Sequence, residues 1–208
     1  MTDKIDRQAH WEKVYQTKAA NSVSWYRQHL DVSLELLEHG GLSSTSQLID
    51  IGGGASTLVD DLLERGMTGV TVLDISEAAL AVPQARLGAR ADAVNWIVAD
   101  VLHAELPEAG FDLWHDRAVF HFLTDPVDAR TYAQQAGRAV KSGGYALIAG
   151  FAPDGPERCS GLPVARRSAD DIARIFAPAF FLQQARAERH FTPAGTAQSF
   201  AYALLKRR

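Results

Sequence analysis

Residues 47–59, Gln-Leu-Ile-Asp-Ile-Gly-Gly-Gly-Ala-Ser-Thr-Leu-Val, contain the local pattern that decides the fold. The apolar run at residues 48–51 predicts a short buried strand. Three glycines at 52–54 interrupt this run, and residues 55–64 have the leucine spacing of an amphipathic helix. Glycine permits a sharp turn and a close approach of a ligand to the main chain, and the start of a helix presents free N–H groups. The stretch therefore predicts a strand, a turn and a helix that bind a nucleotide-like ligand.

Acidic residues accompany the apolar runs that we expect to form the first three strands. Asp50 lies within the first run, and Asp74 and Asp100 close the next two. Asp74 follows Gly54 by twenty residues, the spacing at which a carboxylate reaches the hydroxyls of a ribose. Parallel strands end at one edge of a sheet, so we expect the three carboxylates along that edge. The alternative is that these aspartates only cap helices or form turns.

Two features separate the expected ligand from a dinucleotide. A third glycine or alanine normally brings the helix close to the strand in the dinucleotide fingerprint, but Thr57 has that position here. Asp50 lies two residues before the first glycine, where its charge repels a diphosphate and attracts a cationic amino group. A ligand with ribose, adenine and a positive charge but no phosphate satisfies both features. S-adenosylmethionine is such a molecule.

In these motifs the sequence resembles the class I S-adenosylmethionine-dependent methyltransferases, and the resemblance covers nearly the whole chain. Residues 50–54 match the first motif, D-x-G-x-G, and Asp74 matches the acid of the second strand. Residues 100–101 match the adenine-site pair, and residues 111–117 resemble the fourth strand and the rim of the active site. The resemblance implies a Rossmann-like, doubly wound α/β fold with a seven-stranded mixed sheet, mostly parallel with an antiparallel C-terminal hairpin. It also implies S-adenosyl-L-methionine as cofactor and S-adenosyl-L-homocysteine as product.

Aromatic residues are concentrated before the first strand. Trp11 and Tyr15 lie within a helical pattern over residues 6–17, and Trp25 follows. Packing of this segment onto the core is one interpretation of the spacing, and closure over the cofactor is another. The pattern W-x-x-x-Y followed by a tryptophan is similar to the N-terminal cofactor contacts of the lysine methyltransferases that act on elongation factors. That resemblance implies that these aromatic residues lie near the methionine and adenosine ends of the cofactor, and that Arg117 is a basic contact.

The predicted cofactor-binding residues combine the motif and the resemblance. They are Trp11, Tyr15, Trp25, Asp50, Gly52, Gly54, Asp74, Ile75, Asp100, Val101 and Arg117.

Methyl transfer from a sulfonium chiefly requires alignment and exclusion of water, and it requires a base only when the nucleophile arrives protonated. We therefore predict no particular catalytic residue. His115, Asp116 and His121 are candidate bases or substrate contacts, with ordering of the loop beneath the cofactor as the alternative interpretation. No metal site is predicted, because no cluster of ligating residues has metal spacing.

The remainder of the chain alternates predicted strands and helices, which is typical of a parallel sheet with helices on both faces. Ser76 is the expected N-cap of a helix that Gly88 ends, and Pro83 inside it predicts a kink or a late start. A long loop is expected at residues 152–163. The other expected elements are a helix at 30–38, strands at 94–99, 111–114 and 145–150, helices at 126–140 and 168–176, and hairpin strands at 180–190 and 198–206.

Composition limits the class of protein. The chain has 208 residues, 47% of them hydrophobic, and we expect a single methyltransferase domain over 1–208, with a helical lid segment at 1–45 and a Rossmann-like core at 46–208. A net charge of −4 argues against a nucleic-acid partner. One cysteine, Cys159, precludes an internal disulfide, and together with the lack of a signal peptide or a long apolar run this predicts a cytoplasmic protein without a membrane partner. We expect a monomer or a homodimer.

Fewer observations in the sequence bear on the methyl acceptor than on the cofactor. A small molecule is the first interpretation, because the chain is short and has no added recognition domain. Its pocket is expected between the N-terminal aromatic residues, residues 115–122 and the loop at 153–163. Arg158, Cys159, Arg166 and Arg167 lie on or after that loop. Protein lysine methylation is the second interpretation, and an NAD-type or non-catalytic Rossmann binding protein is an alternative from another class.

Overall fold

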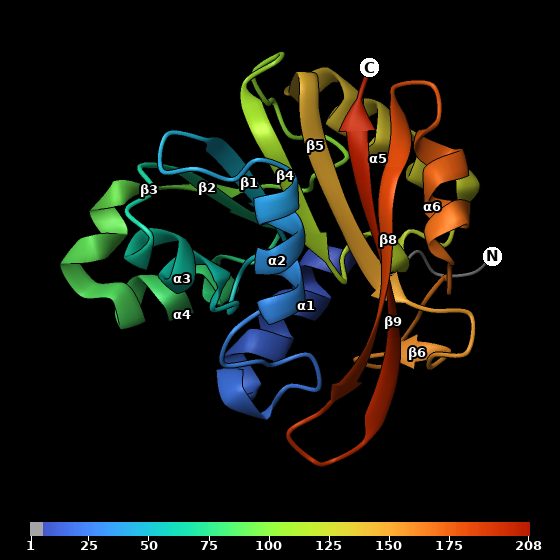
Figure 1. Cartoon of the computed structure of the whole chain (residues 1–208). Coiled ribbons are helices and arrows are strands. Elements are labelled where there is room, and N and C mark those ends of the chain that lie inside the picture. Colours follow the sequence, from blue (N-terminus) through green and yellow to red (C-terminus); the bar gives the residue numbers. More distant parts are fainter. Residues whose placement is uncertain (1–5) are drawn as a thin grey trace.

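A seven-stranded mixed sheet is the centre of the structure, a computed structural model that describes residues 6–208 (Figure 1). The strand order is β3-β2-β1-β4-β5-β9-β8. The five strands β3, β2, β1, β4 and β5 are mutually parallel. Strand β9 pairs antiparallel with β5, and β8 pairs antiparallel with β9. The predicted seven-stranded mixed sheet is therefore confirmed. The first five residues of the expected lid segment lie outside the described part of the chain.

The bounds of the elements are as follows. The strands of the sheet are β1 Gln47–Ile51, β2 Gly69–Asp74, β3 Val94–Val98, β4 Phe111–Arg117, β5 Val140–Phe151, β8 Phe180–Phe191 and β9 Ala197–Arg207, and a separate pair consists of β6 Arg158–Cys159 and β7 Leu162–Pro163. The α-helices are α1 Arg7–Thr17, α2 Asp31–His39, α3 Leu58–Glu64, α4 Glu77–Leu87, α5 Pro126–Ala139 and α6 Ala169–Phe176. Short 3-10 helices occupy Ala20–Ser22, Gly88–Ala93 and Phe120–Phe122.

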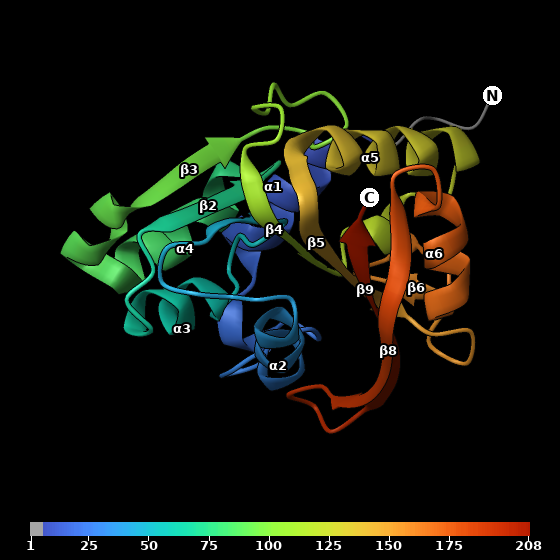
Figure 2. The ribbon, with the colours of Figure 1, turned by 45° about the horizontal axis from the view of Figure 1, so that its top comes forward.

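Helices cover both faces of the sheet. Alternate strand residues point to opposite faces, so Leu48 packs into a core with α2, α3 and α4 while Ile49 packs into a second core with α5 and α6. Figure 2 shows α2 and α3 on one side of the sheet and α5 and α6 on the other. α1 lies at the carboxyl ends of the parallel strands, and the β8–β9 hairpin extends past the same edge (Figure 1). These two elements therefore flank the edge where the sequence predicts the site.

Local sequence signals define several helix ends. Ser76 accepts a hydrogen bond from the N–H of Ala79 as the N-cap of α4, and Gly88 ends that helix with φ of 57°. Ser168 and Asp171 form a reciprocal capping box at the start of α6. The N-cap and the terminating glycine predicted for α4 are confirmed. The expected late start of α4 is wrong, because the helix begins directly after Ser76 and includes Pro83.

Other predicted boundaries also need correction. The helix expected from residue 55 begins only at Leu58, because residues 53–57 form a turn in which Thr57 Oγ1 donates to the carbonyl of Arg27. β4 continues to Arg117 rather than ending at Trp114, because residues 113–117 pair with β5. Polar side chains at 115–117 concealed this strand from sequence analysis.

The fifth strand and the long loop differ from expectation in length. β5 begins at Val140 instead of Tyr145, since Val140 pairs with Phe111 across a bulge. The predicted loop at 152–163 contains the short β6–β7 pair. Within residues 6–208 no helix combines the length and the apolarity that a membrane crossing requires.

Candidate functional site

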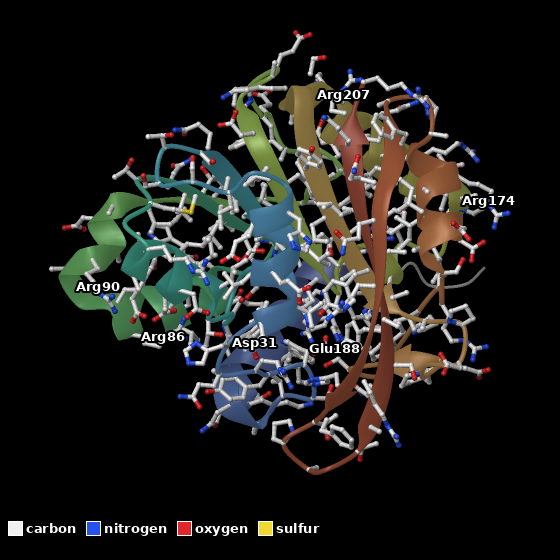
Figure 3. All side chains as sticks on the ribbon, viewed as in Figure 1. Asp31, Arg86, Arg90, Arg174, Glu188 and Arg207 are labelled. Atoms are coloured by element: carbon white, nitrogen blue, oxygen red, sulfur yellow. The ribbon has the colours of Figure 1, made fainter. Side chains whose placement is uncertain are left out.

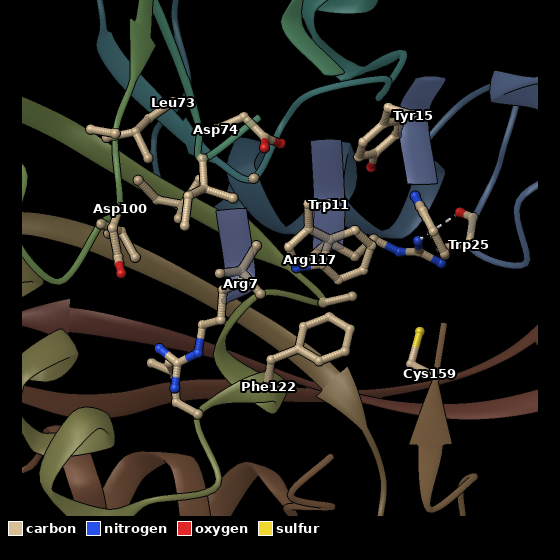
Figure 4. A pocket seen from close by; sticks show the side chains of 18 residues that line it. Arg7, Trp11, Tyr15, Trp25, Leu73, Asp74, Asp100, Arg117, Phe122 and Cys159 are labelled. Atoms are coloured by element: carbon tan, nitrogen blue, oxygen red, sulfur yellow. Dashed lines mark hydrogen bonds between the residues drawn. The ribbon is translucent and has the colours of Figure 1, made fainter. Parts of the chain in front are cut away.

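A pocket walled by aromatic residues opens at the carboxyl edge of the sheet, and we call it the aromatic pocket (Figure 4). Asp74 and Asp100 lie toward one end of it, and Tyr15, Trp25 and Cys159 lie toward the other. Nine of the eleven predicted site residues line it: Trp11, Tyr15, Trp25, Gly52, Asp74, Ile75, Asp100, Val101 and Arg117. Asp50 lines an adjoining pocket along the glycine turn, which we call the glycine-loop pocket, together with Gly52, Arg117 and His115. Gly54 lines neither pocket.

Asp74 is held by the backbone around it. Its Oδ2 accepts a hydrogen bond from the N–H of Gly54 at 3.1 Å, and its Oδ1 accepts one from the N–H of Ser76 at 2.9 Å. The carboxylate is buried, and burial raises the pKa of Asp74 to about 6 in spite of these donors. A carboxylate fixed in this way at the end of β2 presents its remaining lone pairs to the pocket.

Two glycines of the turn are required by close contacts. Gly52 has φ of 66°, and a Cβ at this position would overlap Val119. A Cβ on Gly54 would lie 2.6 Å from Asp74 Oδ2, so only glycine lets this backbone reach the carboxylate. Gly54 therefore acts on the site through Asp74. The start of α3 contributes less than the sequence suggested, because that helix begins four residues after Gly54.

Asp50 forms a buried chain of hydrogen bonds with two residues that lie far from it in sequence. Its Oδ1 lies 2.6 Å from His115 Nδ1, and His115 Nε2 lies 2.9 Å from Ser33 Oγ of α2. All three residues are at most 2% exposed. Asp50 Oδ2 is buried and has no hydrogen-bond partner among residues 6–208. Buried polar atoms are rarely left unpaired, so this oxygen is available to accept a hydrogen bond from a ligand.

Arg117 supplies the opposite charge at the same pockets. Its Nε donates to Tyr202 Oη at 3.0 Å, its Nη1 donates to the carbonyl of Trp25 at 3.1 Å, and its guanidinium lies 4.5 Å from the ring centre of Phe200. Its buried Nη2 makes no hydrogen bond within residues 6–208, although Glu188 Oε2 lies 3.7 Å away. The guanidinium is thus held in place, and its Nη2 remains available to donate a hydrogen bond to a ligand.

The β8–β9 hairpin anchors this arginine. Tyr202 of β9 donates to Glu188 of β8 at 2.6 Å while it accepts from Arg117. Glu188 lies near Asp31 at the start of α2 (Figure 3), and Arg27 Nη2 lies 3.7 and 3.6 Å from their respective carboxylates. The hairpin, α2 and the segment after α1 therefore meet around the glycine-loop pocket.

The N-terminal aromatic residues form one connected wall. The ring centres of Trp11 and Trp25 are 5.8 Å apart, those of Tyr15 and Trp25 are 6.3 Å apart, and Phe122 lies 5.1 Å from Trp11. Such edge-to-face contacts are favourable for aromatic pairs. The wall faces the pocket rather than a closed core, which favours the interpretation that these rings contact a ligand.

Two of the candidate bases, Asp116 and His121, make contacts that hold the surrounding structure in place. Asp116 accepts hydrogen bonds from the N–H groups of Val119 and Phe120 and from the Tyr132 hydroxyl, and burial raises its pKa to about 6. His121 is buried beside Phe151, and burial lowers its pKa to about 3. Neither lines the aromatic pocket. Ordering of the segment that forms the pocket wall is the interpretation that these contacts favour.

Sequence reasoning missed several residues of the site. Arg7 lines the aromatic pocket and pairs with Asp128 of α5 at 2.7 Å. Glu12 accepts a hydrogen bond from Ser76 Oγ at 2.7 Å and so links α1 to α4. Phe122, by contrast, belongs to the segment 115–122 that was predicted as a wall of the acceptor pocket, and it does line the aromatic pocket. Of the residues on the long loop, Cys159 lines the pocket, where burial raises the pKa of its thiol to about 11, whereas Arg158, Arg166 and Arg167 do not.

The sequence is similar to known methyltransferases. Residues 48–144 match the family model described as a methyltransferase domain. The eEF1A lysine and N-terminal methyltransferase of Mus musculus is 26% identical over 149 residues, which are 69% of this chain and 21% of that protein. An uncharacterized methyltransferase of Mycobacterium tuberculosis is 33% identical over 123 residues, or 59% of this chain and 58% of that protein. The chain thus spans about a fifth of the first relative and less than two thirds of the second.

Solved structures share the whole fold. A structure reported for the conversion of a disulfide bond into a thioacetal group during echinomycin biosynthesis has a TM-score of 0.78 at 22% identity, covering 96% of this chain and 92% of that one. The 1,6-didemethyltoxoflavin-N1-methyltransferase of Burkholderia thailandensis, with bound 1,6-didemethyltoxoflavin and S-adenosylhomocysteine, has a TM-score of 0.69 at 21% identity, covering 96% and 83%. At these identities the likeness concerns the fold.

Proposed function

We propose that this chain, which belongs to the class I S-adenosylmethionine-dependent methyltransferase superfamily, transfers the methyl group of S-adenosylmethionine to a small-molecule acceptor. One observation carries the cofactor part of the proposal. The glycine-loop pocket contains an unpaired buried carboxylate oxygen, Asp50 Oδ2, and an unpaired buried guanidinium nitrogen, Arg117 Nη2. One free acceptor on an acid and one free donor on an arginine fit the ammonium and carboxylate groups of an amino acid, and a dinucleotide has no amino-acid group.

The rest of the cofactor fits along the same edge. Asp74 would accept hydrogen bonds from the ribose hydroxyls, and Asp100 and Val101 would contact the adenine at the end of the aromatic pocket. Trp11, Tyr15 and Trp25 would then cover the adenosine and methionine parts. Bound there, S-adenosylmethionine supplies an electrophilic methyl group on a sulfonium.

The residues of the chain contribute alignment and exclusion of water. The aromatic wall keeps solvent from the reacting centre, and rings around a sulfonium stabilise its positive charge. Asp116 holds Val119 and Phe120 through their N–H groups, which fixes the strand-to-helix segment opposite the aromatic wall. An in-line displacement needs this rigidity more than it needs a base.

A small acceptor suits the walls of the aromatic pocket. Trp11, Phe122 and Leu123 line the part between α1 and the 3-10 helix Phe120–Phe122, and Cys159 lies at the β6 side. These surfaces favour a flat or apolar acceptor with a soft or amine nucleophile. The acidic groups that a lysine side chain would need are few there, because Asp116 is occupied by Tyr132 and by two N–H groups.

Protein lysine methylation is the second candidate. It is favoured by the N-terminal aromatic pattern and by the similarity to the eEF1A lysine and N-terminal methyltransferase. A protein acceptor would enter between α1 and the β8–β9 hairpin, which flank the site.

Incubation with labelled S-adenosylmethionine distinguishes the two candidates. The protein is mixed with either cell metabolites below about 3 kDa, a cutoff that excludes folded domains, or protein extract. We expect label in the metabolite fraction. Label found only in protein, at a lysine, would contradict the small-molecule proposal and support the second candidate.

A further inference from the structure

Asp50 and His115 are cross-strand partners in β1 and β4, so their side chains leave the sheet on the same face. The contact between Asp50 Oδ1 and His115 Nδ1, at 2.6 Å, is short and fully buried. On the far side of the ring, Ser33 Oγ of α2 lies 2.9 Å from Nε2. The imidazole is therefore fixed at both nitrogens, between a helix and the first strand.

With a neutral ring and an ionised Asp50, the two contacts assign the tautomer. An ionised Asp50 can only accept, so His115 Nδ1 carries the proton and donates. Nε2 of the neutral ring then accepts from the Ser33 hydroxyl. In this arrangement Asp50 Oδ1 is committed to His115, and the plane of the carboxylate is set by the ring. Only Oδ2, which is buried and unpaired within residues 6–208, remains for a ligand.

We propose that His115, itself held by Ser33, is a positioning residue that fixes Asp50 so that Oδ2 receives the ammonium group of the cofactor's amino-acid part. This inference rests on the proposed function. The consequence is selective: His115 affects the recognition of ligands that have an ammonium group and not of ligands that end at the adenosine thioether.

The negative charge of Asp74 near Asp50 is a further reason why the Asp50 carboxylate needs to be held by His115. Asp74, on the adjacent strand β2, is a second buried carboxylate, and the charge of Asp50 is among the influences that raise its pKa. Without the donor at Nδ1, the buried Asp50 carboxylate would lose its hydrogen-bond partner close to another carboxylate, and its side chain would be free to rotate. That rotation removes the acceptor that the ammonium group needs.

Two amide variants of equal polarity test the inference. In His115→Asn the side-chain amide replaces Nδ1 and keeps a donor to Asp50, whereas in His115→Gln the amide replaces Nε2 and keeps only the contact with Ser33. Calorimetry measures the Kd of S-adenosylhomocysteine and of 5′-methylthioadenosine, which lacks the amino acid, for both variants and the unchanged protein. Thermal unfolding without ligand reports whether each variant is folded.

We expect His115→Gln to weaken S-adenosylhomocysteine binding by about tenfold or more, as the loss of a charge-assisted hydrogen bond predicts. The same variant should change the Kd of 5′-methylthioadenosine by less than about threefold, which is the scale of an uncharged contact. His115→Asn should bind both ligands nearly as the unchanged protein does. Equal losses for both ligands, or equal behaviour of the two variants, would overturn the inference. Failure of the unchanged protein to bind either ligand would instead contradict the proposed function.

Discussion

Glu12 of α1 accepts a hydrogen bond from the Oγ of Ser76, the N-cap residue of α4, at 2.7 Å. The same carboxylate accepts the N–H of Ala78 at 3.2 Å. At the start of α1, Arg7 pairs with Asp128 of α5. α1 is thus attached to the start of α4 through Glu12 and to α5 through Arg7, and these are the contacts that movement of the predicted lid segment would have to break.

The first prediction concerns this attachment. Glu12→Ala should speed hydrogen exchange in residues 7–17 and leave α5 unchanged, because it removes the link to α4. Glu12→Gln keeps an acceptor and serves as the control. S-adenosylhomocysteine should slow exchange across the same segment in the unchanged protein. If exchange in α1 is insensitive to both the substitution and the ligand, α1 is a fixed part of the core.

Acid should release the same contact. The hydrogen bond from Ser76 holds the pKa of Glu12 below its usual value. A lowered pKa means that the contact is present at neutral pH and is lost as the pH falls through that lowered value. The protection factors of α1, which compare measured exchange with the intrinsic rate at each pH, should therefore fall in solutions more acid than the range in which a free glutamate titrates. Glu12→Gln should lack this fall.

A second prediction concerns Asp74. Asp74→Ala should weaken S-adenosylhomocysteine binding about tenfold or more, since it removes charge-assisted hydrogen bonds to the ribose. Asp60→Ala, which removes an acid of α3 outside both pockets, is the matched control. Unchanged affinity in a folded Asp74→Ala protein would mean that the ribose lies elsewhere.

The pH dependence of binding follows from the same residue. Burial raises the pKa of Asp74 to about 6, so the carboxylate is ionised at neutral pH and protonated in more acid solution. Affinity for S-adenosylhomocysteine should fall as the pH drops through about 6. Titration calorimetry between pH 5 and 8, the range that brackets this value, measures the effect.

A third prediction separates backbone strain from a steric clash at the glycine turn. Gly52 and Gly41 both have positive φ, 66° and 84°, but only at Gly52 would a Cβ meet another side chain, that of Val119. Gly41→Ala should cost roughly 1 kcal/mol of stability and leave binding intact. Gly52→Ala should also abolish cofactor binding, and Val119→Ala added to it should restore part of the affinity. Equal effects of the two single variants would contradict the role of the close contact.

A fourth prediction concerns the buried network beneath the pocket. Tyr132 donates to Asp116 and accepts from the indole N–H of Trp114 at 3.0 Å. Tyr132→Phe leaves a buried carboxylate with one donor fewer, which costs about 1–3 kcal/mol. The melting temperature should fall by several degrees, while Tyr145→Phe on the other face of the sheet should have little effect. A larger loss of cofactor affinity than of stability would contradict this structural role.

The parts of the fold that local patterns specify were predicted from the sequence. The glycine turn, the cap at Ser76 and the C-terminal hairpin each depend on residues close together in the chain, and each is confirmed. Boundaries failed where tertiary pairing outweighs local preference, as at residues 115–117 of β4. Polar residues in a central strand give no local strand signal.

The contacts that organise the site were beyond sequence analysis for a related reason. His115 and Asp50 are 65 residues apart, and only the register of β1 against β4 brings them together. Likewise, Glu188 reaches Arg117 only because the β8–β9 hairpin extends past the sheet edge. The residue types of His115 and Glu188 did not indicate which residues they would contact. The position of Asp74 at the site, in contrast, was predicted from its residue type and its spacing from the glycine turn.

Binding of S-adenosylhomocysteine and NAD, compared by calorimetry on the same preparation, tests the central claim most directly. Thr57 and the two unpaired atoms of the glycine-loop pocket, Asp50 Oδ2 and Arg117 Nη2, predict that S-adenosylhomocysteine binds and that NAD at the same concentration does not. A bound ligand at 100 times its Kd should also raise the unfolding free energy by about 2.7 kcal/mol. Binding of NAD to the folded protein, with no response to S-adenosylhomocysteine, would contradict the assignment.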